Sequence, residues 1–199
     1  MTEYRIDDTT LASLRAVWPH RGAAADRVRQ LKYGDRSVAV TVLADAMAAI
    51  ASPADLITWC PASPAALRER GYDQSELLAR ALAHRLRIPA RRLLRRERRD
   101  RPQTERDRAG RLVGPHLHAA GRLRRRPAVL LVDDVTTTGA TLVAAATLLR
   151  RSGAGRVHGL VATRAERPRP DTADGLGVRS ELQPIPGGYE WTSPSAHGT

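Results

Sequence analysis

Residues 129–141 read VLLVDDVTTTGAT, and this run constrains the fold more than any other part of the chain. An aliphatic stretch leads directly into Asp133 and Asp134, which are followed by threonines and a glycine. A short apolar run that ends in turn residues is typical of a buried strand, and the pattern of residues 139–151 predicts a helix after it. Both carboxylates therefore fall at the carboxyl end of a strand, where open α/β sheets bind their ligands.

Hydrophobic periodicity elsewhere predicts helices over residues 22–33, 38–51 and 74–87, and strands over 56–60, near 93–94 and over 156–162. Strands that alternate with helices in this order imply parallel pairing and a doubly wound parallel sheet. We expect an N-terminal helical segment (1–52), a core (53–164) and a Pro/Gly-rich tail (165–199). The tail offers few apolar residues, so we expect it to be loosely held.

The strand-to-helix turn has the properties of an anion site. A helix N-terminus presents unpaired N–H groups and a partial positive charge, and Gly139 lets the backbone approach a ligand closely. Threonine hydroxyls surround it, and two neighbouring carboxylates can accept hydrogen bonds from a sugar diol. This arrangement points to a ribose 5-phosphate, while the simpler alternative is that one aspartate only caps the helix.

The same run resembles the phosphoribosyl pyrophosphate (PRPP) motif of type I phosphoribosyltransferases, without a gap over residues 129–141. The resemblance implies that Asp133 and Asp134 hold the ribose hydroxyls and hold Mg²⁺ indirectly, through PRPP. It assigns the 5-phosphate to the turn that contains Thr136, Thr137, Thr138, Gly139, Ala140 and Thr141. It also implies that the N-terminal helices form the variable hood that selects the acceptor, and that the protein is a homodimer.

Further segments resemble one branch of that family, the ComF/GntX type. These are CPASPAALRERGYDQSELLARALA (60–83), RPQT (101–104) and YGDRSVAVTVLADAMA (33–48). The branch implies single-stranded DNA as a partner in DNA uptake. Three departures stand out: no cysteine-rich zinc module is present, Asp73 replaces the family's Asn, and another Asn is replaced around Gly114. The two replaced asparagines favour an alternative in which the protein is a PRPP sensor without transfer activity.

Arginine accounts for nearly all of the positive charge. The formal net charge is +12, and Lys32 is the only lysine. Such a surplus attracts nucleic acid, phosphorylated metabolites or anionic lipid, although codon bias would also favour arginine over lysine.

Two arginine-containing segments are candidates for contact with the pyrophosphate. Arg68 and Arg70 beside Gly71 are predicted to bind it, with a solvated helix start as the alternative. The arginine-rich segment 95–126 is predicted to be a lid, and the alternative is a solvated insertion. One or two of its polar side chains are expected to close over PRPP, from the set Arg95, Arg96, Arg101, Gln103 and Arg111.

Cysteine content and hydropathy exclude several classes of protein. Cys60 is the only cysteine, which excludes an intrachain disulfide and a zinc cluster built from cysteines. No apolar stretch is long enough for a membrane span, so we expect a cytoplasmic protein without a membrane partner. The function predicted from the sequence is Mg²⁺-dependent transfer of phosphoribosyl from PRPP to an unidentified nucleophile.

Overall fold

The computed structural model describes residues 10–96, 117–165 and 182–191. Its elements follow in the order β1 (Ser13–Pro19), α1 (Gly22–Tyr33), α2 (Arg36–Ala49), β2 (Leu56–Trp59), α3 (Pro64–Arg70), α4 (Gln74–Leu86), β3 (Leu94–Arg96), β4 (Leu117–Ala119), β5 (Ala128–Thr136), α5 (Ala140–Arg151), β6 (Arg156–Arg164), β7 (Leu182–Ile185) and β8 (Gly188–Trp191). The helices and strands predicted from periodicity are confirmed to within a few residues at their ends.

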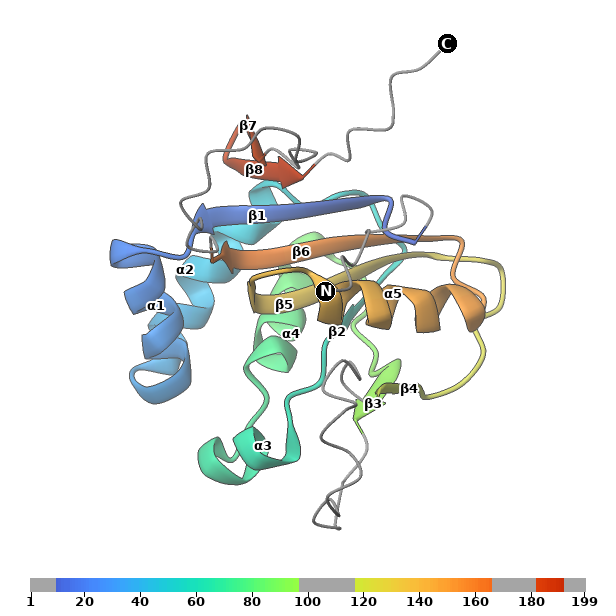
Figure 1. Ribbon diagram of the computed structural model, residues 1–199, viewed down its shortest axis with the longest axis horizontal. Helices are drawn as coiled ribbons and strands as arrows, with labels where there is room; N and C mark the ends of the chain where they lie inside the picture. The colour runs from blue at the N-terminus through green and yellow to red at the C-terminus, as the bar shows by residue number, and fades with distance from the viewer. Residues whose placement is uncertain (1–9, 97–116, 166–181, 192–199) are drawn as a thin grey trace, which may run out of the picture.

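A six-stranded sheet in the order β2-β5-β6-β1-β8-β7 forms the centre of the molecule (Figure 1). Strands β2, β5, β6 and β1 are parallel, whereas β8 and β7 add an antiparallel edge. Helices cover both faces, so the predicted doubly wound, mostly parallel sheet is confirmed. The carboxyl ends of the parallel strands lie along a single edge of this sheet.

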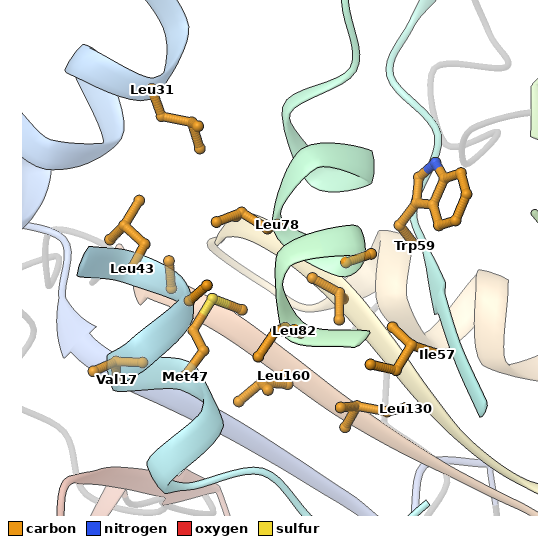
Figure 2. Close-up of a cluster of buried hydrophobic side chains, with 14 of the residues drawn as sticks. Val17, Leu31, Leu43, Met47, Ile57, Trp59, Leu78, Leu82, Leu130 and Leu160 are labelled. Carbon is orange, nitrogen blue, oxygen red and sulfur yellow. The ribbon is translucent and has the colours of Figure 1, made fainter. Parts of the chain in front are cut away.

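Helices α1, α2 and α4 pack on one face of the sheet. Leu31, Met47 and Leu82 from these helices are fully buried, and they belong to one apolar cluster with Leu130 and Leu160 of the central strands (Figure 2). The other face carries α5, whose buried side chains meet the alternate residues of the same strands. In β5, Leu130 and Val132 face the first group of helices and Val129 and Leu131 face α5.

Strand β1 and the β7–β8 hairpin were not predicted from the sequence. β1 lies inside the segment expected to be helical, and the hairpin lies inside the expected tail, yet both belong to the main sheet. Arg15 interrupts the apolar pattern of β1, and its guanidinium is satisfied by Glu190 of β8 and by the carbonyl of Ile50. These partners are far away in the sequence, so no local pattern reveals the strand.

The two ends of the predicted lid belong to the folded core. β3 and β4 pair as a small antiparallel sheet, and their Leu94 and Leu117 are buried with the side chains of α5. Residues 97–116 lie outside the described part of the chain, and with them Gln103, Arg111 and Gly114. No helix in the described ranges has the length and apolar character needed to cross a bilayer.

Candidate functional site

The carboxyl end of β5 brings together residues from two helices. Asp133 and Asp134 lie at this end, as predicted, and they are held by different partners. Ser75, in the first turn of α4, donates its hydroxyl to Asp133 Oδ1 over 2.8 Å. Lys32, in the last turn of α1, places its Nζ 2.8 Å from Asp134 Oδ2. The site therefore forms where α1, α4 and β5 meet.

Asp133 is destabilised in its charged form. Burial is the main reason that its pKa lies well above the usual range, and the negative charge of Asp134 raises it further. The hydrogen bonds from Ser75 and from the backbone N–H of Asp134 oppose this shift only in part. A ligand that donates hydroxyls or brings positive charge would therefore stabilise the ionised pair.

The ion pair between Lys32 and Asp134 is largely shielded from water. Their side chains are 23% and 7% exposed, respectively. Tyr72 fixes this end of α1 because its hydroxyl lies 2.8 Å from the carbonyl oxygens of both Leu31 and Lys32. The guanidinium of Arg36 stacks 4.4 Å from the centre of the Tyr72 ring. These contacts place the only lysine of the chain at the predicted site.

The turn after β5 has the geometry of an anion cradle. Thr136 Oγ1 accepts a hydrogen bond from the N–H of Gly139, and Thr138 Oγ1 accepts one from Ala140. Gly139 is the N-cap of α5 with φ of +75°, a conformation that glycine adopts without strain, and it makes no side-chain cap hydrogen bond of its own. Thr137 and Thr138 are exposed, so an anion has access to this helix N-terminus.

Asp73 is the N-cap of α4. Its Oδ1 accepts hydrogen bonds from the N–H groups of Ser75 and Glu76, and its Oδ2 accepts one from Ala62. Its pKa is raised mainly by burial, against the effect of these three bonds. The Asp73 carboxylate is therefore engaged by backbone donors at the start of α4 and in the loop before α3.

Arg68 and Arg70 lie in the last turn of α3, and Gly71 is its left-handed cap with φ of +76°. This corrects the alternative in which they begin a helix. Arg70 Nη1 donates to Gln74 over 2.7 Å, which joins it to the first turn of α4. Its buried Nε–H has no hydrogen-bond partner among the described residues, whereas Arg68 is exposed. Arg70 is thus the better placed of the two to meet an anion.

Cys60 is buried beside the Asp133 carboxylate. Burial, followed by the charge of Asp133, raises the pKa of its thiol well above the usual range. The thiol therefore stays protonated, and its position favours packing over nucleophilic chemistry. In the described part of the chain, no three His, Cys, Asp or Glu side chains gather as a set of metal ligands.

Residues 73–191 match the family described as phosphoribosyl transferase domain. This match covers more than half of the chain and includes β5, the turn and α5. The chain belongs to the phosphoribosyl transferase domain family. No curated protein matches it.

Several solved structures resemble this chain at low identity. One, described as the allosteric regulatory enzyme of purine biosynthesis, is 22% identical over 67% of this chain, with a TM-score of 0.46. This chain spans only 30% of that protein's length. Orotate phosphoribosyltransferase from Aeropyrum pernix is 19% identical, with a TM-score of 0.39 and coverage of 64% of this chain and 60% of that one. Adenine phosphoribosyltransferase from Thermoanaerobacter pseudethanolicus is 20% identical, with a TM-score of 0.38 and coverage of 66% and 69%.

Sequence reasoning missed Lys32 and Ser75 as members of this site. Lys32 had one usable signal, since it is the only lysine in a chain in which arginine supplies the other cationic side chains. Ser75 had none, because a serine in the first turn of a helix reads as ordinary capping chemistry. Their contacts with the aspartates arise only when the sheet brings α1 and α4 to the end of β5.

Proposed function

We propose that this phosphoribosyl transferase domain protein binds PRPP at the end of β5 and transfers its phosphoribosyl group to a nucleophile, with Mg²⁺. The observation that carries the proposal is the carboxylate pair Asp133–Asp134 directly before an open, glycine-capped helix N-terminus. Carboxylates accept hydrogen bonds from a ribose diol, and the turn from Thr136 to Thr141 supplies N–H and hydroxyl donors for the 5-phosphate.

Transfer requires cleavage of the bond between ribose C1 and the diphosphate, through a transition state with oxocarbenium character. The contribution of the protein is to orient the ribose, to neutralise the departing diphosphate and to exclude water. Asp133 and Asp134 orient the ribose in this scheme. The buried Nε–H of Arg70, which has no partner within residues 10–96, 117–165 and 182–191, supports a role for this residue at the diphosphate. Gln103 and Arg111 are proposed to join it from the segment 97–116.

The side chains of the site fit Mg²⁺ as an ion held mainly by the substrate. Mg²⁺ prefers oxygen ligands and is commonly bound by one or two carboxylates together with substrate phosphates. Asp133 and Asp134 supply two carboxylates, and the raised pKa of Asp133 indicates a site whose ionised form gains from added positive charge. When bound, the ion would add positive charge near the departing diphosphate.

Calorimetric titration with PRPP and Mg²⁺ tests the proposal. We expect saturable binding to the wild type and at least about tenfold weaker binding to Asp134→Asn, since a hydrogen bond to a charged group contributes about 1.5–3 kcal/mol. Arg29→Ala is the matched control, because Arg29 is an exposed residue of α1 and belongs to no part of the site. Absence of heat with the wild type refutes PRPP binding, and equal affinity of Asp134→Asn refutes the diol assignment.

Transfer itself is tested by release of pyrophosphate with candidate acceptors. Release of pyrophosphate would exclude the alternative of a PRPP sensor without activity. That alternative is favoured by the replacement of a family Asn around Gly114. The chain is proposed to divide into an N-terminal segment (1–52), a core (53–164) and a tail (165–199). The N-terminal segment is proposed to select the acceptor. A cytoplasmic homodimer remains part of this proposal.

A second candidate function is that of a ComF-like accessory protein that binds single-stranded DNA. The net charge of +12 favours it. Single strands usually stack on exposed aromatic rings, and here Trp59 is only 2% exposed although two arginines flank it. This candidate is supported if a labelled oligonucleotide binds and the logarithm of its binding constant falls steeply and linearly with the logarithm of the salt concentration. Its absence at moderate salt excludes it.

A further inference from the structure

A pocket of about 310 Å³ lies at the amino ends of the strands, away from the carboxyl edge that carries the candidate site. It is lined by Asp55, Arg126, Ala128, Gly155 and Arg156. Ala128 and Arg156 are the first residues of β5 and β6, whereas Asp133 and Asp134 lie near the other end of β5. The pocket is therefore separate from the residues proposed to bind PRPP.

The turn that forms one wall of this pocket, residues 121–127, is tightly fixed. Leu123 N–H donates to the carbonyl of Ser152 over 2.6 Å, and Gly155 N–H donates to the carbonyl of Pro127 over 2.9 Å. A methyl group on Gly155 would lie 2.1 Å from the carbonyl oxygen of Arg126. Only glycine permits so close an approach, so the basic turn is docked on the core and its arginines are presented from a rigid base.

The backbone of this turn is unusual. Arg125 and Arg126 have φ of +65° and +47°, in the left-handed region that side chains other than Gly, Asn and Asp rarely adopt. Strained residues of this kind cluster at ligand sites. Arg126 and Arg156 are both exposed, so their guanidiniums are accessible to a ligand.

Charge at this end of the molecule is strongly positive. Exposed arginines of the turn and its neighbours are Arg122, Arg124, Arg125, Arg126, Arg151 and Arg156. Asp55 is the only acidic lining residue of the pocket, and its Oδ2 already accepts a hydrogen bond from Ala128 N–H over 2.7 Å. Cationic groups therefore outnumber the single carboxylate, whose charge is partly compensated.

We propose that this pocket binds a small phosphate-bearing ligand with at least two negative charges, such as the diphosphate group of a nucleotide. Guanidinium groups bind phosphate oxygens through paired hydrogen bonds, and Arg126 and Arg156 face the pocket from two different elements. The volume lies at the lower end of the range for small-molecule sites, which favours a compact group over a long polymer. This site does not depend on the function proposed for the carboxyl edge.

Nuclear magnetic resonance of the ¹⁵N-labelled full chain, titrated with pyrophosphate without Mg²⁺ at 0.15 M salt, tests the proposal. The amides of Ala128 and Gly155 report on this pocket, and those of Gly139 and Ala140 report on the turn after β5. We expect saturable shifts at Ala128 and Gly155 in the wild type. The double variant Arg126→Gln/Arg156→Gln should weaken the affinity at least tenfold, whereas Arg29→Ala, which removes one positive charge from α1, should leave it unchanged.

Several outcomes would overturn this assignment. One is a lack of saturable shifts at Ala128 and Gly155, and another is equal affinity in the double variant when its spectrum shows that it is folded. A third is that a single-stranded oligonucleotide shifts these amides and pyrophosphate does not, which would assign the surface to nucleic acid. Shifts confined to Gly139 and Ala140 would support PRPP-site binding and refute the second pocket, so the two proposals fail separately.

Discussion

The buried ion pair between Lys32 and Asp134 allows a quantitative test of how the site is built. Substitution of Lys32 by methionine keeps most of the apolar stem of the side chain but leaves the Asp134 carboxylate, 7% exposed, without its cation. Loss of one partner of a buried pair typically costs about 3–5 kcal/mol. The partial exposure of Lys32, at 23%, puts the expected loss near the lower end, about 3 kcal/mol. For a chain of this length that corresponds to a fall in Tm of about 6–12 °C.

A double-mutant cycle isolates the interaction. Asp134→Asn should cost less than Lys32→Met, because an unpaired Lys32 can turn its ammonium toward water. The double variant Lys32→Met/Asp134→Asn removes both charges, so it should be more stable than Lys32→Met alone, with a coupling of about 1–3 kcal/mol. Urea unfolding of the four proteins gives these values. Arg29→Ala should change stability by less than about 0.5 kcal/mol, because the side chain of Arg29 is 72% exposed.

Two results would refute this reasoning. Lys32→Met could unfold at the same urea concentration as the wild type, which would mean that Asp134 is not effectively buried. Alternatively, the losses in the two single variants could simply add in the double variant, which would mean that the two side chains do not interact.

Three further predictions concern the capping, titration and packing of single residues. Asp73→Ala should lower the free energy of unfolding by about 2 kcal/mol, and Asp73→Asn by about 1 kcal/mol. The difference arises because Asn keeps the hydrogen bonds from Ser75 and Glu76 and loses the one from Ala62. Equal losses in urea unfolding would contradict this. Asp133 has a raised pKa, so the native state holds its proton more tightly than the unfolded state, and the resulting stability is lost as pH rises above about 4. Asp133→Asn should therefore be more stable than the wild type at pH 7 and bind PRPP more weakly, and the stability difference should disappear near pH 3; a constant difference across this range would show that titration is not the cause. Gly155→Ala should lower the free energy of unfolding by about 1–3 kcal/mol, because its methyl group would meet the carbonyl oxygen of Arg126. Gly121→Ala, whose methyl group would lie in open space, should lower it by less than about 1 kcal/mol. Similar thermal melts for the two variants would argue against the close approach.

The parts of the fold that could be predicted from sequence are those whose signal is local. The run from Val129 to Thr141 contains its own strand, turn and helix start, so its structure follows from neighbouring residues. Helix α1 likewise begins and ends where periodicity and Gly34 indicate. Such segments carry their information within one or two turns of chain.

The remainder depends on partners far away in the sequence. Arg15 is compatible with β1 only because Glu190 neutralises it across 175 positions of chain. Lys32 lies on α1 like any solvated residue, and its role appears only when the fold brings Asp134, at the carboxyl end of β5, to that helix. The arginines of 121–127 read as part of a lid, but Gly153 and Gly155 allow their turn to dock at the other end of the sheet. Close backbone approach leaves no periodic pattern in a sequence.

The position of β1 also determines when the protein can fold during its synthesis. Its two neighbours in the sheet, β6 and β8, are among the last elements of the chain, and Ser13 contacts His158 across 145 positions. At about 5–20 residues per second, a ribosome needs about 7–30 s to make the intervening chain. Throughout that interval the apolar residues of β1 have no strand to pair with, so the nascent protein is an expected client of chaperones that bind extended hydrophobic segments.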